Sequence, residues 1–215
     1  MTLVVAIPSK DFIVLGADSR VTVQDVGGTR VEINEIEKIV KVAKHVVMLL
    51  YGSSEEGNYL AREFMERNEH IDGATKVVKK FAVFCQKETK EVRRESIPYF
   101  GFIIAGLDKQ GQKYRIPRCY TLESGSGFMP GLPPLPYAVK GKLILALFFF
   151  GQNYKPDMGL DELCDLVGQC IYDVLCVDGD VGGRIRVGII DERGFRERPS
   201  ANVKANIKQR GEPVV

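Results

Sequence analysis

The sequence predicts an α+β fold in which two β-sheets share one core and a helical layer covers the outer face of each sheet. Two observations predict it. The expected elements follow the order strands, two helices, strands, two helices, strands, which differs from the alternation of a parallel sheet and from an all-β sandwich. The 215 residues are 45% apolar and 27% charged, as in globular chains. We therefore expect one domain over residues 1–215, with a polar C-terminal tail over about residues 199–215.

Short aliphatic and β-branched runs, separated by turn residues, predict four strands before the first helix. The runs span residues 3–7, 12–17, 39–42 and 46–51. Pro8-Ser9-Lys10-Asp11 joins the first two runs over a length typical of a hairpin, and Ala43-Lys44-His45 joins the other two. Two pairs of strands are thus expected at the start of the fold.

A helical period begins at Ser54, where Ser54-Glu55-Glu56 supplies a polar cap and an acidic first turn. A second helix is expected over residues 74–87. Its apolar stripe is expected to be buried and consists of Val77, Val78, Phe81, Val83, Phe84 and Cys85. The remaining expected elements are strands 99–106 and 113–119, helices 139–149 and 160–176, and a closing hairpin over 184–196.

Charge and hydropathy exclude several classes of partner. Thirty Lys and Arg residues against 28 Asp and Glu residues give a net charge of +2, too balanced to predict binding to nucleic acid or to a membrane surface. The longest apolar run, residues 143–150, is far shorter than the ~20 residues of a membrane-spanning helix. Because the N-terminal residues also lack a basic segment and a cleavage-site pattern, we expect a cytoplasmic protein.

The five cysteines predict neither disulfides nor a metal site. Their number is odd, and they include no C-x-x-C pair. Cys164, Cys170 and Cys176 recur every six residues, a spacing that scatters them around a helix. We interpret the cysteines as small buried hydrophobic residues in a reducing compartment.

Several short motifs stand in a definite order along the chain. They are Thr2 at the start of the first strand, Asp18-Ser19-Arg20-Val21-Thr22 after the second, Glu37-Lys38-Ile39, Gly52, Ile103 to Asp108, Gly125-Ser126-Gly127, and Asp178 to Gly183. Together they resemble the proteasome β-subunit family of N-terminal nucleophile (Ntn) hydrolases. The resemblance covers residues 2 to about 198, and the A-D-S-R-x-T and E-K-I segments are its most specific parts.

The resemblance implies a four-layer αββα sandwich of two antiparallel sheets flanked by helices, the Ntn hydrolase fold. It also implies a threonine peptidase in which Thr2, once Met1 is removed, provides the nucleophilic hydroxyl. The free α-amine of Thr2 would be the base, because an amine with a reference pKa of about 8 is partly unprotonated near neutral pH. No cofactor and no metal are needed.

The resemblance assigns further roles. Lys38 would favour the ionised nucleophile, and Asp18 would hold Lys38 in its charged form. The remaining catalytic assignments are Gly52, whose N–H would form the oxyanion hole, and Ser126 and Asp178, which would hold the α-amine. Val21 and Thr22 would form the strand edge along which a peptide pairs, and Val21, Ile36 and Leu50 would line an apolar specificity pocket.

One departure from the family pattern keeps other functions open. Valine stands at position 181, where the family commonly has a serine beside the amine. A non-catalytic ring or scaffold subunit and a small-molecule Ntn amidase are therefore the alternatives. For the peptidase, the resemblance implies peptide or unfolded protein substrates, a homo-oligomeric ring, and an ATPase or α-type ring as partner.

The motifs taken singly also have structural readings. Asp18 and Arg20 would by themselves be an ion pair in a solvated turn, and Lys38 a surface group. Thr2 would be the first residue of an edge strand. Only their combination indicates catalysis.

Overall fold

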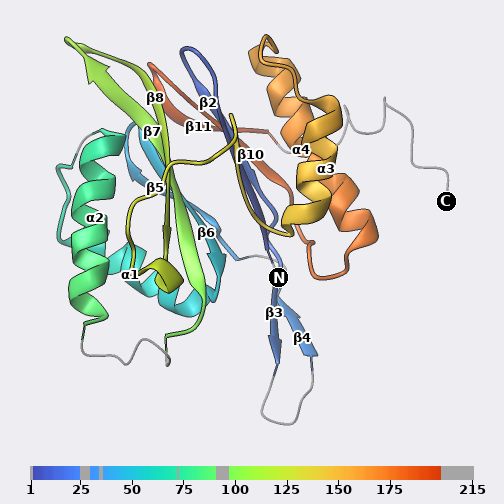
Figure 1. The fold of residues 1–215 in the computed structure, drawn as a ribbon, viewed down its shortest axis with the longest axis horizontal. Helices are drawn as coiled ribbons and strands as arrows, with labels where there is room; N and C mark the ends of the chain where they lie inside the picture. The colour runs from blue at the N-terminus through green and yellow to red at the C-terminus, as the bar shows by residue number, and fades with distance from the viewer. Residues whose placement is uncertain (1, 25–29, 34–35, 72, 91–96, 200–215) are drawn as a thin grey trace.

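The computed structural model describes residues 2–24, 30–33, 36–71, 73–90 and 97–199. Figure 1 shows these residues as layers, with a helical layer, the two sheets and a second helical layer in succession. One outer layer contains α1 (Ser54–Glu66) and α2 (Ala74–Glu88), and the other contains α3 (Leu143–Asn153) and α4 (Leu160–Val177). The predicted α+β class and its αββα order are confirmed.

Two antiparallel sheets form the inner layers, in the strand orders β11-β10-β2-β1-β9 and β5-β6-β7-β8. The first sheet consists of β1 (Leu3–Pro8), β2 (Ile13–Ala17), β9 (Ala138–Gly141), β10 (Arg186–Asp191) and β11 (Gly194–Arg198). The second consists of β5 (Ile39–Ala43), β6 (Val46–Gly52), β7 (Phe100–Gln110) and β8 (Lys113–Glu123). A separate hairpin pairs β3 (Val21–Gln24) with β4 (Arg30–Ile33) and projects beyond the two sheets (Figure 1).

The alternation of side chains along β1 supplies two layers of the core. Leu3 and Val5 pack in the cluster beneath α3 and α4. Val4 and Ala6 point the other way and pack between the two sheets. A third cluster, which includes Phe81 of α2, lies between the second sheet and α1 and α2. Since Thr2 shares the parity of Val4 and Ala6, its position falls at the end of the layer between the sheets.

Two element predictions are wrong. Among the described residues, six strands precede α1, because the motif after β2 continues into the β3–β4 hairpin. The helix expected over residues 139–149 begins only at Leu143, and the residues before it form β9, which pairs with β1 from Leu3↔Gly141 to Ala6↔Ala138. Val139 is β-branched and buried, and it completes the sheet edge beside β1. Helix α1 begins at Ser54 as predicted. Helices α2 and α4 begin at the predicted residues and end one residue beyond their predicted ends.

Two side-chain predictions are also wrong. Val83 of α2 is 66% exposed, whereas Ala82 takes a buried place on that helix. Cys85, Cys119, Cys164 and Cys170 are buried as expected, but Cys176 near the end of α4 is exposed. The predicted polar tail lies outside the described residues, apart from Pro199.

Candidate active site

The beginning of β1 and the end of β2 bring Thr2 and Asp18 into one site. The antiparallel register pairs Val4 with Ala17, so that the residues following β2 lie beside the residues that open β1. The Leu3 N–H donates to Asp18 Oδ1 over 2.9 Å, and the Asp18 N–H donates to the Leu3 carbonyl over 3.2 Å. Thr2 is only 6% exposed, and Asp18 only 1%. A buried carboxylate is thereby fixed next to the candidate nucleophile.

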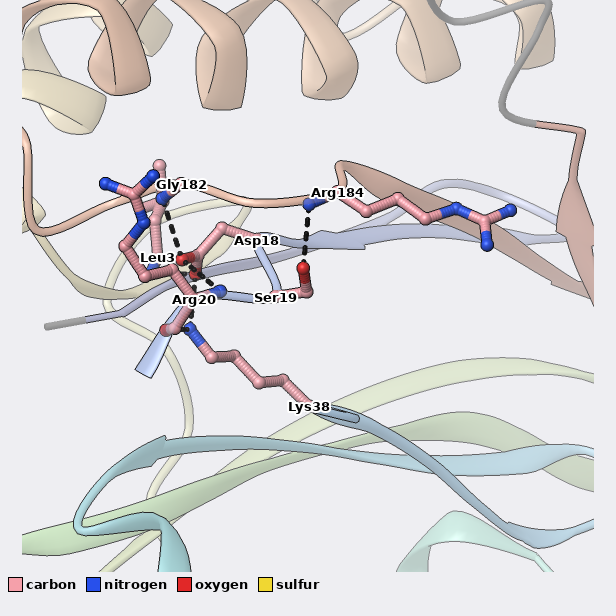
Figure 2. Close-up of polar contacts among 7 residues, drawn as sticks. All are labelled: Leu3, Asp18, Ser19, Arg20, Lys38, Gly182 and Arg184. Carbon is pink, nitrogen blue, oxygen red and sulfur yellow. Dashed lines mark hydrogen bonds and ion pairs between the residues drawn. The ribbon is translucent and has the colours of Figure 1, made fainter. Parts of the chain in front are cut away.

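Lys38 reaches this carboxylate from the other sheet. It lies just before β5, and its Nζ is 2.8 Å from Asp18 Oδ1. The same ammonium donates to the Arg20 carbonyl, and Figure 2 shows the side chain extending between the sheets toward Asp18. Lys38 is 3% exposed, and burial lowers its pKa while the charge and hydrogen bond of Asp18 oppose that shift. The ammonium of a lysine removed from water in this way favours the ionised form of a nearby acidic group.

The loop after α4 fastens the end of β2. The Gly182 N–H donates to Asp18 Oδ2 over 3.2 Å, and the Gly182 carbonyl accepts from the N–H groups of Ser19 (3.1 Å) and Arg20 (3.0 Å). The Ser19 hydroxyl accepts from the Arg184 N–H over 2.7 Å (Figure 2). A Cβ on residue 182 would lie 2.4 Å from the Arg20 guanidinium carbon, so a larger residue there would displace the Arg20 side chain. The Asp18 carboxylate therefore accepts bonds from β1, from Lys38 and from this loop.

The turn from β9 into α3 forms the other side of the site. The Lys142 N–H donates to the Thr2 carbonyl over 3.1 Å. Gly141 has φ +98°, and a Cβ there would lie 1.6 Å from the Thr2 carbonyl oxygen, so only glycine permits β9 to approach Thr2 so closely. Lys142 Nζ is 2.6 Å from Asp178 Oδ2 and 3.6 Å from Asp180 Oδ2.

Sequence reasoning missed Gly141 and Lys142, because residues 139–149 were expected to be one helix. The sequence does contain a signal: Gly141 interrupts the run between Val139 and Leu143 and is typical of a turn. Asp178, which was predicted, does come to this side of the site. It caps the C-terminal end of α4. Its carboxylate pairs with the Lys142 ammonium and accepts a hydrogen bond from the Asp180 N–H over 3.0 Å.

Ser126 makes a hydrogen bond within its own loop. It lies in a short 3-10 helix, Ser124–Ser126, and its exposed side chain donates to the Glu123 carbonyl of its own loop over 3.0 Å. Val181, the residue that departs from the family pattern, is 1% exposed and packs in the cluster beneath α4. Position 181 thus provides a core valine and no hydroxyl, and the role of Ser126 at the amine stays a prediction.

Gly52 ends β6 with φ +82°, and a Cβ there would lie 2.4 Å from the Tyr99 carbonyl oxygen. The glycine is therefore already required by the close approach of the chain before β7. A side chain at this position would disturb the backbone before it could obstruct a substrate. Its role in an oxyanion hole stays a prediction.

The predicted substrate residues divide between the hairpin and the core. Val21 and Thr22 begin β3 and pair with Ile33 and Glu32 of β4. Ile36 is half-buried and lines a pocket of about 370 Å³, together with Ser19, Glu37, Arg184, Arg186 and Glu197. Leu50 is 4% exposed and packs in the cluster beneath α1, so its predicted place as an open pocket wall is corrected: the alternation along β6 directs it into the core.

Within the described ranges, no group of His, Cys, Asp and Glu side chains is arranged to hold a metal ion. The same residues contain no helix long and apolar enough to cross a membrane. The site is thus built from a lysine–carboxylate pair on each side of Thr2: Lys38 with Asp18, and Lys142 with Asp178.

Comparison with known proteins identifies the family of the chain. The family model described as proteasome subunit matches residues 2–190. A proteasome subunit beta of Ferroglobus placidus is 26% identical, covering 97% of this chain and 95% of its own length. Proteasome subunit beta type-1 of Saccharomyces cerevisiae is 26% identical over 90% of this chain and 85% of its own, and proteasome subunit beta type-6 of Arabidopsis thaliana is 26% identical over 90% and 78%.

The fold and the site define an Ntn-type αββα protein. The chain belongs to the proteasome subunit family, and its relatives are of the β type. It is therefore a proteasome-type subunit, either a peptidase or a component of the ring.

Proposed function

We propose that the protein is a threonine peptidase of the proteasome β type, in which Thr2 becomes the N-terminal residue and attacks the peptide carbonyl. One observation carries the proposal. The buried Lys38–Asp18 pair, 2.8 Å apart, lies beside Thr2 and is held by the Leu3 N–H. An ion pair with side chains 3% and 0% exposed is costly to bury, and two surface groups in a solvated turn would not be arranged in this way.

The chemistry follows from the charges. The Lys38 ammonium would stabilise negative charge developing on the Thr2 hydroxyl oxygen, and Asp18 would keep that ammonium protonated although burial lowers its pKa. The freed α-amine of Thr2 would accept the hydroxyl proton directly or through a water. The Gly52 N–H would stabilise the oxyanion. The α-amine would give this proton to the departing amine as the peptide C–N bond breaks, which leaves the acyl group as an ester on the Thr2 oxygen. Water would then hydrolyse this ester.

Substrate would bind along β3. A peptide pairing with Val21 and Thr22 would add a strand to the hairpin, which fixes its direction by main-chain hydrogen bonds. Val21 and Ile36 are aliphatic and half-buried, and they support a preference for substrates with an apolar residue before the cleaved bond. Peptides or unfolded proteins are the substrate class.

The assembly would be a homo-oligomeric ring, with an ATPase or an α-type ring as partner. The relatives' names describe subunits of a larger proteasome. The outer helix α3 also supports assembly, since it contains no charged residue and exposes Ile144 (84%) and Phe148 (67%). Contiguous apolar surface of this kind is typical of an interface with another protein.

A non-catalytic ring subunit is the second candidate. It is favoured by the residues expected to hold the α-amine. Val181 is a core residue without a hydroxyl, Ser126 donates to a carbonyl of its own loop, and Asp178 is already in an ion pair with Lys142. Such a subunit would retain the fold and the ring while hydrolysing nothing.

Hydrolysis of a fluorogenic peptide with an apolar residue before the cleaved bond tests the proposal. Lys38→Ala is expected to lower kcat/KM by about 10³-fold or more, because removal of one donor to a developing oxyanion already costs about 10²–10³-fold. Lys41→Ala is the matched control, since Lys41 is an exposed lysine on the adjoining strand, and it should retain full activity.

Three outcomes would separate the candidates. Equal hydrolysis by both variants would contradict the role of Lys38. Absence of hydrolysis in the assembled chain that begins at Thr2 would favour the ring subunit. Turnover of small amides but not of peptides would favour an amidase.

A further inference from the structure

A second lysine, Lys142, lies beside Thr2 on the β9 side of β1, whereas Asp18 lies on the β2 side. The β1–β9 register pairs Leu3 with Gly141, so its continuation places Lys142 opposite Thr2. The hydrogen bond from the Lys142 N–H to the Thr2 carbonyl shows this pairing directly. In an antiparallel ladder the N–H and the C=O of one residue point to the same neighbouring strand. The nitrogen of Thr2 therefore points toward Lys142.

The Lys142 ammonium and the Asp178 carboxylate form an ion pair on that side. Nζ lies 2.6 Å from Asp178 Oδ2, and the side chains are 22% and 16% exposed. Asp180 adds a second carboxylate at 3.6 Å. Burial opposes ionisation of Asp178, yet the hydrogen bonds from Lys142 and from the Asp180 N–H bring its pKa below the usual value. Asp178 is thus an ionised carboxylate that already has a cationic partner.

Charged groups from several elements lie around the start of β1. The end of β2 contributes Asp18, and the residue before β5 contributes Lys38. Arg20 follows β2, and its guanidinium donates to the Gly179 carbonyl. The loop after α4 contributes Asp178 and Asp180, and the turn after β9 contributes Lys142. Asp18 is paired with Lys38, and the Lys142 ammonium lies closer to Asp178 than to Asp180. Loss of Lys142 would therefore leave Asp178 without its nearest cation and add net negative charge on this side of Thr2.

We propose that Lys142 is a positioning residue that keeps the terminal amine of Thr2 neutral by holding Asp178 in an ion pair. An unpaired carboxylate near an amine favours the protonated amine, and a protonated amine has no lone pair with which to accept the hydroxyl proton. This inference rests on the proposed function, since the amine exists only when Thr2 is terminal. It gives a role to a residue that the resemblance did not assign.

The test measures the ionisation of the amine without turnover. The chain is released to begin at Thr2 by cleavage of a ubiquitin fusion, and the Thr2 methyl resonance, labelled with ¹³C, is followed as a function of pH. Lys142→Met should move its titration midpoint upward by about one unit, as expected when an opposite charge nearby loses its partner. This shift means about tenfold less neutral amine at a given pH below the midpoint.

Four further variants determine whether charge is the cause. Lys142→Arg should keep the wild-type midpoint. The double variant Lys142→Met/Asp178→Asn should return it toward the wild-type value. Asp178→Asn alone, which leaves Lys142 unpaired, should lower it. Lys140→Met is the matched control, because Lys140 lies on β9 two residues before Lys142 and pairs with Glu123 of β8 at 2.6 Å, and it should leave the midpoint unchanged.

An unchanged midpoint in Lys142→Met would overturn the inference, as would a double variant that stays as high as the single one. Should Lys142→Met fail to fold, an unchanged midpoint in Asp178→Asn would overturn it equally. The proposed function fails in a different way. A chain that shows the predicted shifts but hydrolyses no peptide would support the role of Lys142 and contradict the peptidase.

Discussion

At the scale of single residues, the site depends on close backbone contacts as much as on charged side chains. Gly141 and Gly52 both have positive φ, and both are adjacent to a carbonyl that a Cβ would strike. Gly141 sets the distance between β9 and Thr2, which places Lys142 opposite the candidate nucleophile. The geometry around Thr2 is therefore sensitive to a single methyl group.

Gly141→Ala is expected to lower the free energy of unfolding by at least about 2 kcal/mol, because it combines an unfavourable φ with a direct clash against the Thr2 carbonyl. Gly151→Ala is the control. Gly151 lies in α3 with open space around its Cβ position, so alanine there should be neutral or stabilising by up to about 1 kcal/mol. Urea denaturation measures both, and equal stability of the two variants would contradict the role given to Gly141.

Residue types predicted part of this site from the sequence. Asp18 and Lys38 were found because the resemblance named them together, and the structure brings them within 2.8 Å. The role of Ser126 stays a prediction, because Gly125-Ser126-Gly127 is a motif of only three residues, whereas the segment beside Thr2 is decided by which strand pairs with β1. Non-local pairing of this kind cannot be read from one short motif.

At the scale of elements, α3 is the part least explained by the isolated chain. Its sequence is apolar on all sides, yet among its residues only Ala146 and Phe150 are buried. Soluble surface helices typically have one polar face. The exposed apolar face therefore supports the proposed contact with another copy in the ring.

Phe148→Glu is expected to reduce the oligomer to smaller species, because it places a charge in that apolar contact. Val83→Glu is the matched control, since Val83 is similarly exposed (66% against 67%) but lies on α2 in the opposite helical layer. Light scattering coupled to size exclusion reports the mass, and circular dichroism checks the fold. An unchanged oligomer in Phe148→Glu would remove α3 from the interface.

Element prediction succeeded where the periodic pattern was long and failed at short strands. Helices α1, α2 and α4 follow clear apolar stripes and were located well. Strands β3, β4 and β9 have four residues each and gain their stability from a partner strand, so their local sequence carries little signal. The residues before α3 were merged into it for this reason.

At the scale of the whole molecule, the candidate site is formed by residues from both sheets and from the segments that connect them to the helices. Lys38 comes from one sheet, while Thr2, Asp18 and Lys142 come from the other sheet and its connections. The site therefore exists only when both sheets are assembled. The net charge of +2 gives no sign of such a site, because the site depends on where a few charged residues lie in the fold and not on the overall composition.

The most direct test of the central claim is intact-mass spectrometry of the native protein after incubation with a β-lactone, an electrophile that acylates an N-terminal threonine. The native protein is expected to lack Met1 and to carry one adduct, located on Thr2 by fragmentation, and Thr2→Ala is expected to carry none. Quantitative retention of Met1 with no adduct on Thr2 would contradict the peptidase.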